Sequence, residues 1–89
     1  MRHHLHKELD LQEGDEVRVG LTAAASVYLV DEANYALYLE DQEFEYYGGT
    51  AKQSPYRILA PGAGVWHLVV EQLDSRDSLS VAVQLIRAR

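Results

Sequence analysis

Cysteine is absent from this chain of 89 residues. Disulfides and thiolate-bound metals are therefore excluded as sources of stability, and a reducing compartment is permitted. A chain of this length has room for one domain, and folding buries only about 60 to 65% of the surface of the unfolded chain. We expect a single domain over residues 1–89, with one compact core.

Long apolar runs are also missing. No stretch approaches the roughly 18 apolar residues that a membrane-spanning helix requires. The N-terminal stretch MRHHLHKELD lacks the apolar region of a secretory signal. These absences predict a soluble, unprocessed, cytoplasmic protein.

Basic residues are few and scattered. Eight Lys and Arg stand against fourteen Asp and Glu, which gives a formal net charge of −6 at pH 7. Proteins that bind nucleic acid use basic patches to displace counterions from phosphates, and anionic membranes require similar patches. We therefore expect neither nucleic acid nor membrane as a partner, whereas basic protein partners and cationic ligands remain open.

Several segments have the residue pattern of short β-strands. Some alternate between apolar and polar residues, and others are rich in β-branched and aromatic residues. These segments are residues 15–21, 25–30, 56–60, 64–73 and 79–86. Residues 64–73 are apolar on both alternating faces, which is typical of a central strand that is buried on both sides.

The connections between these segments favour antiparallel pairing. The turns APGAG and DSRDS are too short to contain a crossover helix. The pattern therefore predicts an all-β fold, either a small barrel or, as we prefer, a small antiparallel β-sandwich of jelly-roll-like form. The residues expected in its core are Trp66, Leu68, Val81 and Val83.

One segment, DEANYALYLED, does not alternate. Ala33 and Leu37 occur at helical spacing after Asp31, which is a suitable N-cap. We expect a short helix near residues 32–40 that covers an end of the sandwich. Tyr35 and Tyr38 would then lie on one helical face, because they are three residues apart.

Five motifs follow one another along most of the chain. They are HKELDLQEGDEV, LVDEANYALY, YYGG, SPYR and GVWHLVV. In this combination the sequence resembles a family of small bacterial β-rich domains catalogued as a domain of unknown function, whose members stand alone or are joined to TIR-type domains. The resemblance implies a β-sandwich, a bacterial origin and no established activity, and it assigns no catalytic residue.

Histidines supply two chemical hypotheses. His4, His6 and Glu8 would share one face of an extended segment, and a His-x-His spacing occurs in metal sites. The alternative is that they are outward residues of an edge strand, so we assign no metal or other cofactor and keep His4 and His6 as the candidates. His67 lies in an apolar strand and is either a core imidazole held by one hydrogen bond or a general base.

The segment YYGGTAKQSPYR has the composition of a recognition loop. Tyrosine offers a large rigid contact surface, and glycine lets the backbone bend or approach a partner closely. The alternative is that a tyrosine closes the end of the core while Gly48 and Gly49 form a turn. We predict that Tyr35, Tyr38, Tyr47 and this turn meet at one end of the sandwich.

Two classes of function follow from these observations. The preferred one is a non-enzymatic module that binds a small molecule or a protein through the residues Tyr35, Tyr38, Tyr47, Gly48, Gly49 and His67. The second is a small hydrolase-like enzyme that uses His67 with a nearby carboxylate such as Asp31. The chain contains no Gly-x-Ser-x-Gly motif. A small core without disulfides also predicts a homodimer formed through a strand edge or the tyrosine-bearing face.

Overall fold

The computed structural model describes residues 4–74, 76 and 78–88, which form strands and a short helix. The strands are β1 (Leu5–Leu11), β2 (Glu16–Leu21), β3 (Ala25–Asp31), β4 (Tyr47–Ala51), β5 (Tyr56–Leu59), β6 (Gly64–Gln72) and β7 (Val81–Ile86), and the helix is α1 (Glu32–Leu39). The prediction of a mainly β fold with one short helix is confirmed for the described residues.

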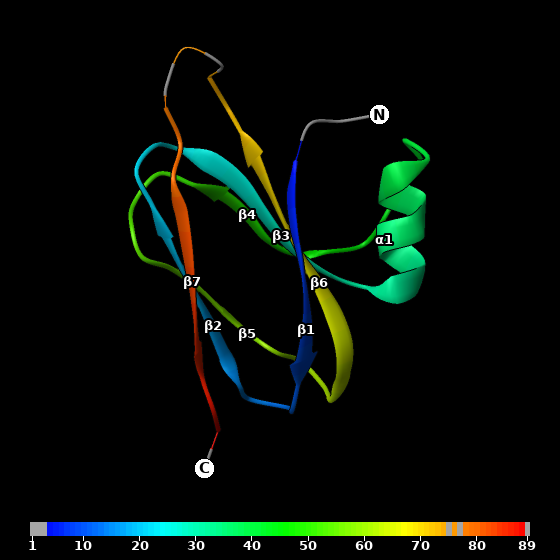
Figure 1. Cartoon of the computed structure of the whole chain (residues 1–89). Helices are drawn as coiled ribbons and strands as arrows, with labels where there is room; N and C mark the ends of the chain where they lie inside the picture. Colours follow the sequence, from blue (N-terminus) through cyan, green and yellow to red (C-terminus); the bar gives the residue numbers. More distant parts are fainter. Residues whose placement is uncertain (1–3, 75, 77, 89) are drawn as a thin grey trace.

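The strands form two antiparallel sheets, with the orders β1-β6-β3-β4 and β5-β2-β7. β3 pairs with β4, β2 with β5, and β1 with β6, so the pairs are nested around α1. This nesting is that of a long hairpin wrapped into two layers, which is the principle of a jelly roll. Figure 1 shows the three-stranded sheet on the left and α1 on the right, with β1, β3 and β6 between them.

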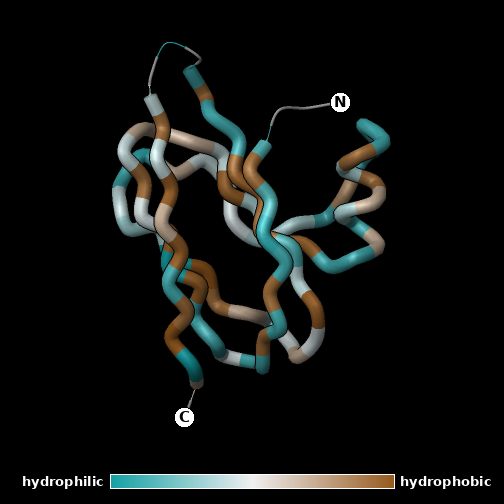
Figure 2. The backbone as a smooth tube through the Cα atoms, in the orientation of Figure 1, coloured by the Kyte–Doolittle hydropathy of each residue, from teal (hydrophilic) through white to brown (hydrophobic). Residues whose placement is uncertain are grey.

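The core lies between the two sheets. Alternate residues of β2 and β6 point into it, and Val17, Val19, Leu68 and Val70 are almost completely buried. β6 pairs with β1 on one side and with β3 on the other, so its predicted central position is confirmed. In Figure 2 most of the tube of β7 is on the brown side of the scale, in agreement with its largely apolar sequence VAVQLI.

Leu68 is buried as predicted, but the other expected core residues are only half-buried. Trp66, Val81 and Val83 pack against the core from its margin. The two valines belong to β7, which is an edge strand of the three-stranded sheet. An edge strand has a neighbour on one side only, so its inward side chains keep some contact with solvent.

Helix α1 begins directly after β3. Asp31 is its N-cap, as predicted, and its side chain accepts a hydrogen bond from the backbone N–H of Asn34 at 2.8 Å. The helix lies on the outer face of the four-stranded sheet, where Tyr38 packs with Val30 and Val69. The prediction that it covers an end of the sandwich was therefore wrong. Leu37 of this helix is 37% exposed.

Asp15 connects the turn after β1 to the C-terminal segment. Its carboxylate accepts hydrogen bonds from the backbone N–H of Gln12 at 2.8 Å, from the backbone N–H of Ala88 at 2.7 Å and from the guanidinium of Arg87 at 2.9 Å. These hydrogen bonds lower the pKa of Asp15 to about 2, and the one from Gln12 has the largest effect. Asp15 thereby links the turn between β1 and β2 to residues 87 and 88, which follow β7.

Asp15→Asn is expected to destabilise the protein at neutral pH and much less in acid. The pKa of folded Asp15 lies below that of an unfolded aspartate, so its stabilising effect is complete above about pH 4 and declines as the pH falls toward 2. Urea midpoints of wild type and variant measure this difference. Asp10→Asn, at an exposed position of β1, is the control. An equal effect of Asp15→Asn at both pH values would contradict the prediction.

Candidate functional site

The outer face of the four-stranded sheet collects histidines from two strands. Glu8 of β1 lies directly opposite His67 of β6, and His6 lies opposite Val69. Because side chains alternate along a strand, His6 and Glu8 point to the same face of the sheet as His67. Helix α1 covers this face and adds Tyr35 and Tyr38. We call His4, His6, Tyr35, Tyr38 and His67 the histidine–tyrosine cluster.

The rings of this cluster are stacked or meet edge to face. Tyr35 is nearly parallel to both His6 and His67, with ring centroids 4.3 Å and 4.6 Å apart. His4 meets the face of Tyr38 edge-on at 5.0 Å. Such contacts hold α1 against the sheet and fix the orientation of the imidazole rings.

Hydrogen bonds connect the same residues. His6 Nε2 lies 2.7 Å from His67 Nδ1, and His4 Nε2 lies 3.1 Å from the hydroxyl of Tyr35. The hydroxyl of Tyr38 donates to the carboxylate of Glu71 on β6. The imidazole of His67 is therefore held by a hydrogen bond through Nδ1, as the structural interpretation of this residue predicted.

Burial shifts the pKa values of two side chains of the cluster, His6 and Tyr35. The pKa of His6 lies below its usual value, mainly because burial disfavours the cation and also because His67 and His4 are nearby, while Glu8 opposes this shift. Burial raises the pKa of the Tyr35 hydroxyl. Near neutral pH these two side chains act as neutral donors and acceptors of hydrogen bonds.

The second nitrogen of His67 faces two carboxylates. Its Nε2 lies 3.9 Å from Glu32 Oε1. A carboxylate oxygen of Glu8, one of Glu32 and a ring nitrogen of His67 all lie within 4.8 Å of one another. The nearby carboxylate predicted for His67 was Asp31, but the Oδ1 atom of Asp31 accepts from the N–H and the side-chain amide of Asn34. Glu32 is thus the acid beside His67, because the N-cap side chain is turned toward the first turn of the helix.

A separate cleft of about 470 Å³ opens on the other side of the start of α1. We call it the aromatic cleft. It is lined by Leu29, Val30, Asp31, Asn34, Phe44, Glu45, Tyr46, Tyr47 and Trp66. Its size lies in the range of small-molecule sites, which are mostly apolar with a few polar groups. The charged residues of its lining are both acidic.

The walls of the aromatic cleft are well defined. Tyr47 and Trp66 meet edge to face with ring centroids 6.0 Å apart, and Trp66 Nε1 donates to the carbonyl of Gly62 at 3.0 Å. The backbone N–H of Glu45 donates to Asn34 Oδ1 at 2.8 Å. Tyr47 is 50% exposed, so its ring presents a face to solvent beside a fixed indole.

A family model matches the whole chain, residues 1–89, and its description is domain of unknown function (DUF1883). The chain belongs to this family. No curated protein and no solved structure matches the DUF1883 chain. The resemblance to a family catalogued as a domain of unknown function is therefore confirmed, and it carries no assigned activity. In the part of the DUF1883 chain that the structure describes, no helix is long and apolar enough to cross a membrane.

The predicted recognition residues of this DUF1883 domain lie in two places. Tyr35, Tyr38 and His67 belong to the histidine–tyrosine cluster, whereas Tyr47 lines the aromatic cleft. Tyr38 is 1% exposed, so its ring is a core residue of the outer face. Tyr47 is separated from the others because it pairs with Leu29 of β3, whose side chain points into the core, whereas the histidine–tyrosine cluster lies on the outer face.

We predicted that Gly48 and Gly49 form a turn, and this prediction was wrong, because both lie inside β4. They pair with Tyr28 and Val27 of β3 and have φ values of 118° and 150°. Backbone of this kind favours glycine, which has no Cβ. The two glycines therefore allow β4 to approach β3 closely in an unusual conformation.

Sequence reasoning missed several residues of both sites. Glu32 was not singled out, and Phe44 and Tyr46 were not assigned to a cleft. No local signal marks them. Phe44 and Tyr46 depend on the path of residues 40–46, and Glu32 reaches His67 because β3, which α1 follows, pairs with β6. The register Glu8↔His67 would have been a usable signal once those two strands were known to be neighbours.

Proposed function

We propose that this DUF1883 domain is a non-enzymatic binding module that holds a cationic group of a ligand in the aromatic cleft. The observation that carries the proposal is the composition of the cleft wall, where the exposed rings of Tyr46 and Tyr47 lie with Trp66 beside Asp31 and Glu45. Aromatic faces and carboxylates both attract cations. The net charge of −6 acts in the same direction.

The ligand class that fits best is a lysine or arginine side chain of a partner protein. Its aliphatic stem would pack on the rings while its charged end meets the acidic rim. Acidic rims and aromatic anchors of this kind give interfaces much of their binding energy and their on-rate. Residues Tyr35, Tyr38, Gly48, Gly49 and His67 would then act as support for the cleft and the sheet beneath it.

Tyr47→Ala is expected to weaken binding of a short arginine-rich peptide at least about tenfold, because the variant loses one aromatic wall. Trp66 is the single tryptophan of the chain and lies in the cleft, so its emission reports occupancy. The variant is expected to unfold within about 1 kcal/mol of wild type, since Tyr47 is half-exposed.

Leu59→Ala is the matched control, because Leu59 is an exposed apolar residue of β5 that does not line the cleft. It should bind the peptide as wild type does. A glutamate-rich peptide of the same length should not bind. Equal binding of both peptides, or an equal loss in Leu59→Ala and Tyr47→Ala, would contradict the proposal.

A hydrolase-like enzyme is the second candidate function. It is supported by the buried imidazole of His67, whose Nδ1 is held by His6 while its Nε2 faces Glu32. A general base needs such orientation. Turnover of nitrophenyl esters and phosphodiesters by wild type, abolished in His67→Ala, would establish this function, whereas the absence of turnover by wild type would exclude it for those substrates.

Origin, location and assembly stay predictions. The family resemblance supports a bacterial origin, and it implies that members of the family stand alone or are joined to TIR-type domains. The proposed cytoplasmic location rests on the absence of cysteine from the sequence. Exposed leucines on two edge strands support a homodimer: Leu5 on β1 is 44% exposed and Leu59 on β5 is 62% exposed. Unprotected strand edges with apolar side chains favour association.

A further inference from the structure

One buried nitrogen on the outer face of the four-stranded sheet lacks a partner. The side chain of His67 is 5% exposed, and its Nδ1 lies 2.7 Å from His6 Nε2. Its Nε2 atom has no hydrogen-bond partner among the described residues. Buried polar atoms are nearly always satisfied, because leaving one unpaired is unfavourable. This nitrogen therefore points to a ligand that the protein itself does not supply.

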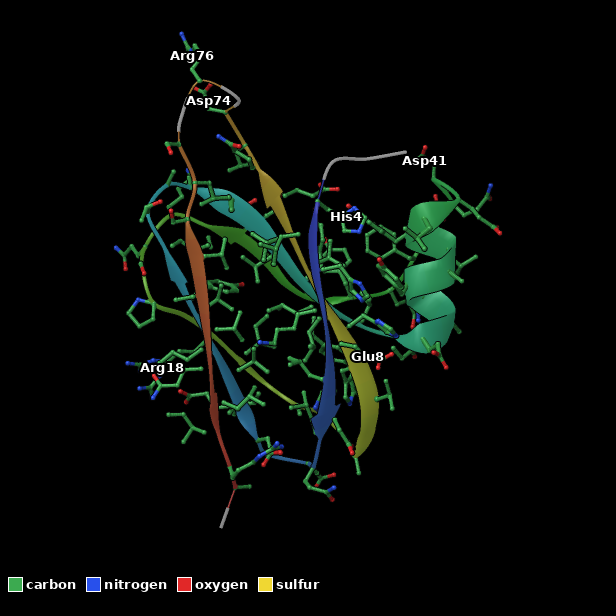
Figure 3. The ribbon with its side chains drawn as sticks, viewed as in Figure 1. His4, Glu8, Arg18, Asp41, Asp74 and Arg76 are labelled. Atoms are coloured by element: carbon green, nitrogen blue, oxygen red, sulfur yellow. The ribbon has the colours of Figure 1, made fainter. Side chains whose placement is uncertain are left out.

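Two exposed carboxylates lie next to this nitrogen. Glu8 stands directly opposite His67 in the pairing of β1 with β6, and Glu32 is the first residue of α1. One oxygen of each carboxylate and a ring nitrogen of His67 all lie within 4.8 Å of one another, and His67 Nε2 is 3.9 Å from Glu32 Oε1. Figure 3 shows the Glu8 side chain between β1 and the start of α1. Three elements of the fold thus bring three donor atoms to one point.

We propose that His67, Glu8 and Glu32 bind a divalent transition metal ion of the Zn²⁺ type. Imidazole nitrogens and carboxylate oxygens are both ligands of such ions, and the combined charge of −2 of the two carboxylates balances that of the cation. Tetrahedral ligands about 2.0 to 2.2 Å from a metal lie about 3.4 Å from one another. His67 Nε2 and Glu32 Oε1 are 3.9 Å apart, and the Glu32 side chain is 81% exposed, so a small rotation closes the site.

His6 can accept the hydrogen bond that orients His67 as a metal ligand. A metal on Nε2 requires the proton of the neutral imidazole to be on Nδ1, which then donates to His6 Nε2. Tyr35 stacks on both imidazoles and fixes the plane of His67. The buried ligand is thereby oriented in advance, while the two exposed glutamates close on the ion from solvent.

Three protein ligands leave one position of a tetrahedral ion open. A water molecule or a donor atom of a ligand would occupy it, as in zinc sites that keep an accessible coordination position. Ca²⁺ and Mg²⁺ prefer oxygen ligands in larger number, so an imidazole with two carboxylates discriminates against them. The site shares no residue with the lining of the aromatic cleft, so the two proposals stand or fall separately.

The test is a titration of the metal-free, tag-free protein with ZnCl₂ against a chromogenic indicator. Wild type is expected to bind one equivalent, and Glu8→Gln and Glu32→Gln are each expected to weaken binding at least about tenfold. Both residues are exposed, so the variants should fold as wild type does. Glu13→Gln removes the same charge at another exposed position and should bind normally. Unchanged zinc affinity in both Glu8→Gln and Glu32→Gln would overturn the proposal.

The N-terminal histidines require their own control, since they are alternative zinc ligands. His4→Gln should retain zinc binding, because His4 is not one of the three ligands. In long-range ¹H–¹⁵N spectra, zinc should shift the Nε2 resonance of His67 and leave Nδ1 protonated. Loss of binding in His4→Gln, or shifts confined to His4 and His6, would mean that the terminus holds the metal and would overturn the proposal.

Discussion

Gly48→Ala is expected to prevent stable folding of this domain. A Cβ built at this position would lie 2.2 Å from the carbonyl oxygen of Val27 on the paired strand, and the φ of 118° is unfavourable for any L side chain. The clash is with backbone, so it is relieved only by moving β4 away from β3. We expect a loss of at least about 4 kcal/mol, which is comparable with the total stability of a domain of this size.

Gly62→Ala is the matched control for this experiment. Apart from its two chain neighbours, no described residue has a heavy atom within 4 Å of a Cβ added at Gly62, which is in the turn between β5 and β6. Circular dichroism and urea unfolding should show a native fold and a change within about 0.5 kcal/mol for Gly62→Ala. A folded Gly48→Ala variant with the same urea midpoint as Gly62→Ala would show that β4 tolerates a side chain at that position.

Leu68→Ala is expected to lower the free energy of unfolding by about 2 to 5 kcal/mol, because it leaves a cavity in the core. Leu68 has no exposed surface and lies on β6, the strand between β1 and β3, where it belongs to the core cluster between the two sheets. A small disulfide-free domain has little reserve, so the variant should be partly unfolded at 37 °C, which thermal unfolding measures.

Val65→Ala tests the same strand at an exposed position. Val65 is 46% exposed, so truncating its side chain should change the stability by less than about 1 kcal/mol. Similar losses in Leu68→Ala and Val65→Ala would mean that β6 is not packed as the structure describes.

Alternation along the strands was sufficient to predict the sandwich. In β2 and β6 the residues that point into the core are apolar at every second position, and this signal is contained in a few consecutive residues. The N-cap at Asp31 is equally local, since its partner Asn34 is three residues away. The strand β4 was missed because two of its five residues are glycines, which have no side chain to show a pattern.

The candidate sites were predicted only in part. His67 and Tyr47 were singled out by residue type, and each belongs to a site. Their partners were not found, because the partners are distant in the sequence. Glu32 lies near His67, and Trp66 meets Tyr47. The sequence also placed three tyrosines and two glycines on one surface. The structure separates them, because α1 lies on the outer face of the four-stranded sheet and Tyr47 lines the aromatic cleft.

Local features determined the strands, the helix start and the acidic character of this protein, because alternation, capping and charge depend on residues that are close together in the chain. Only the tertiary structure decided that α1 lies on the outer face of the four-stranded sheet and that Glu8 stands opposite His67. The physical reason is that strand order and register depend on how nested strands and the helix together bury the most apolar surface. That balance is a property of the whole chain, so the meeting of β1, β6 and α1 at His67 cannot be read from any one segment.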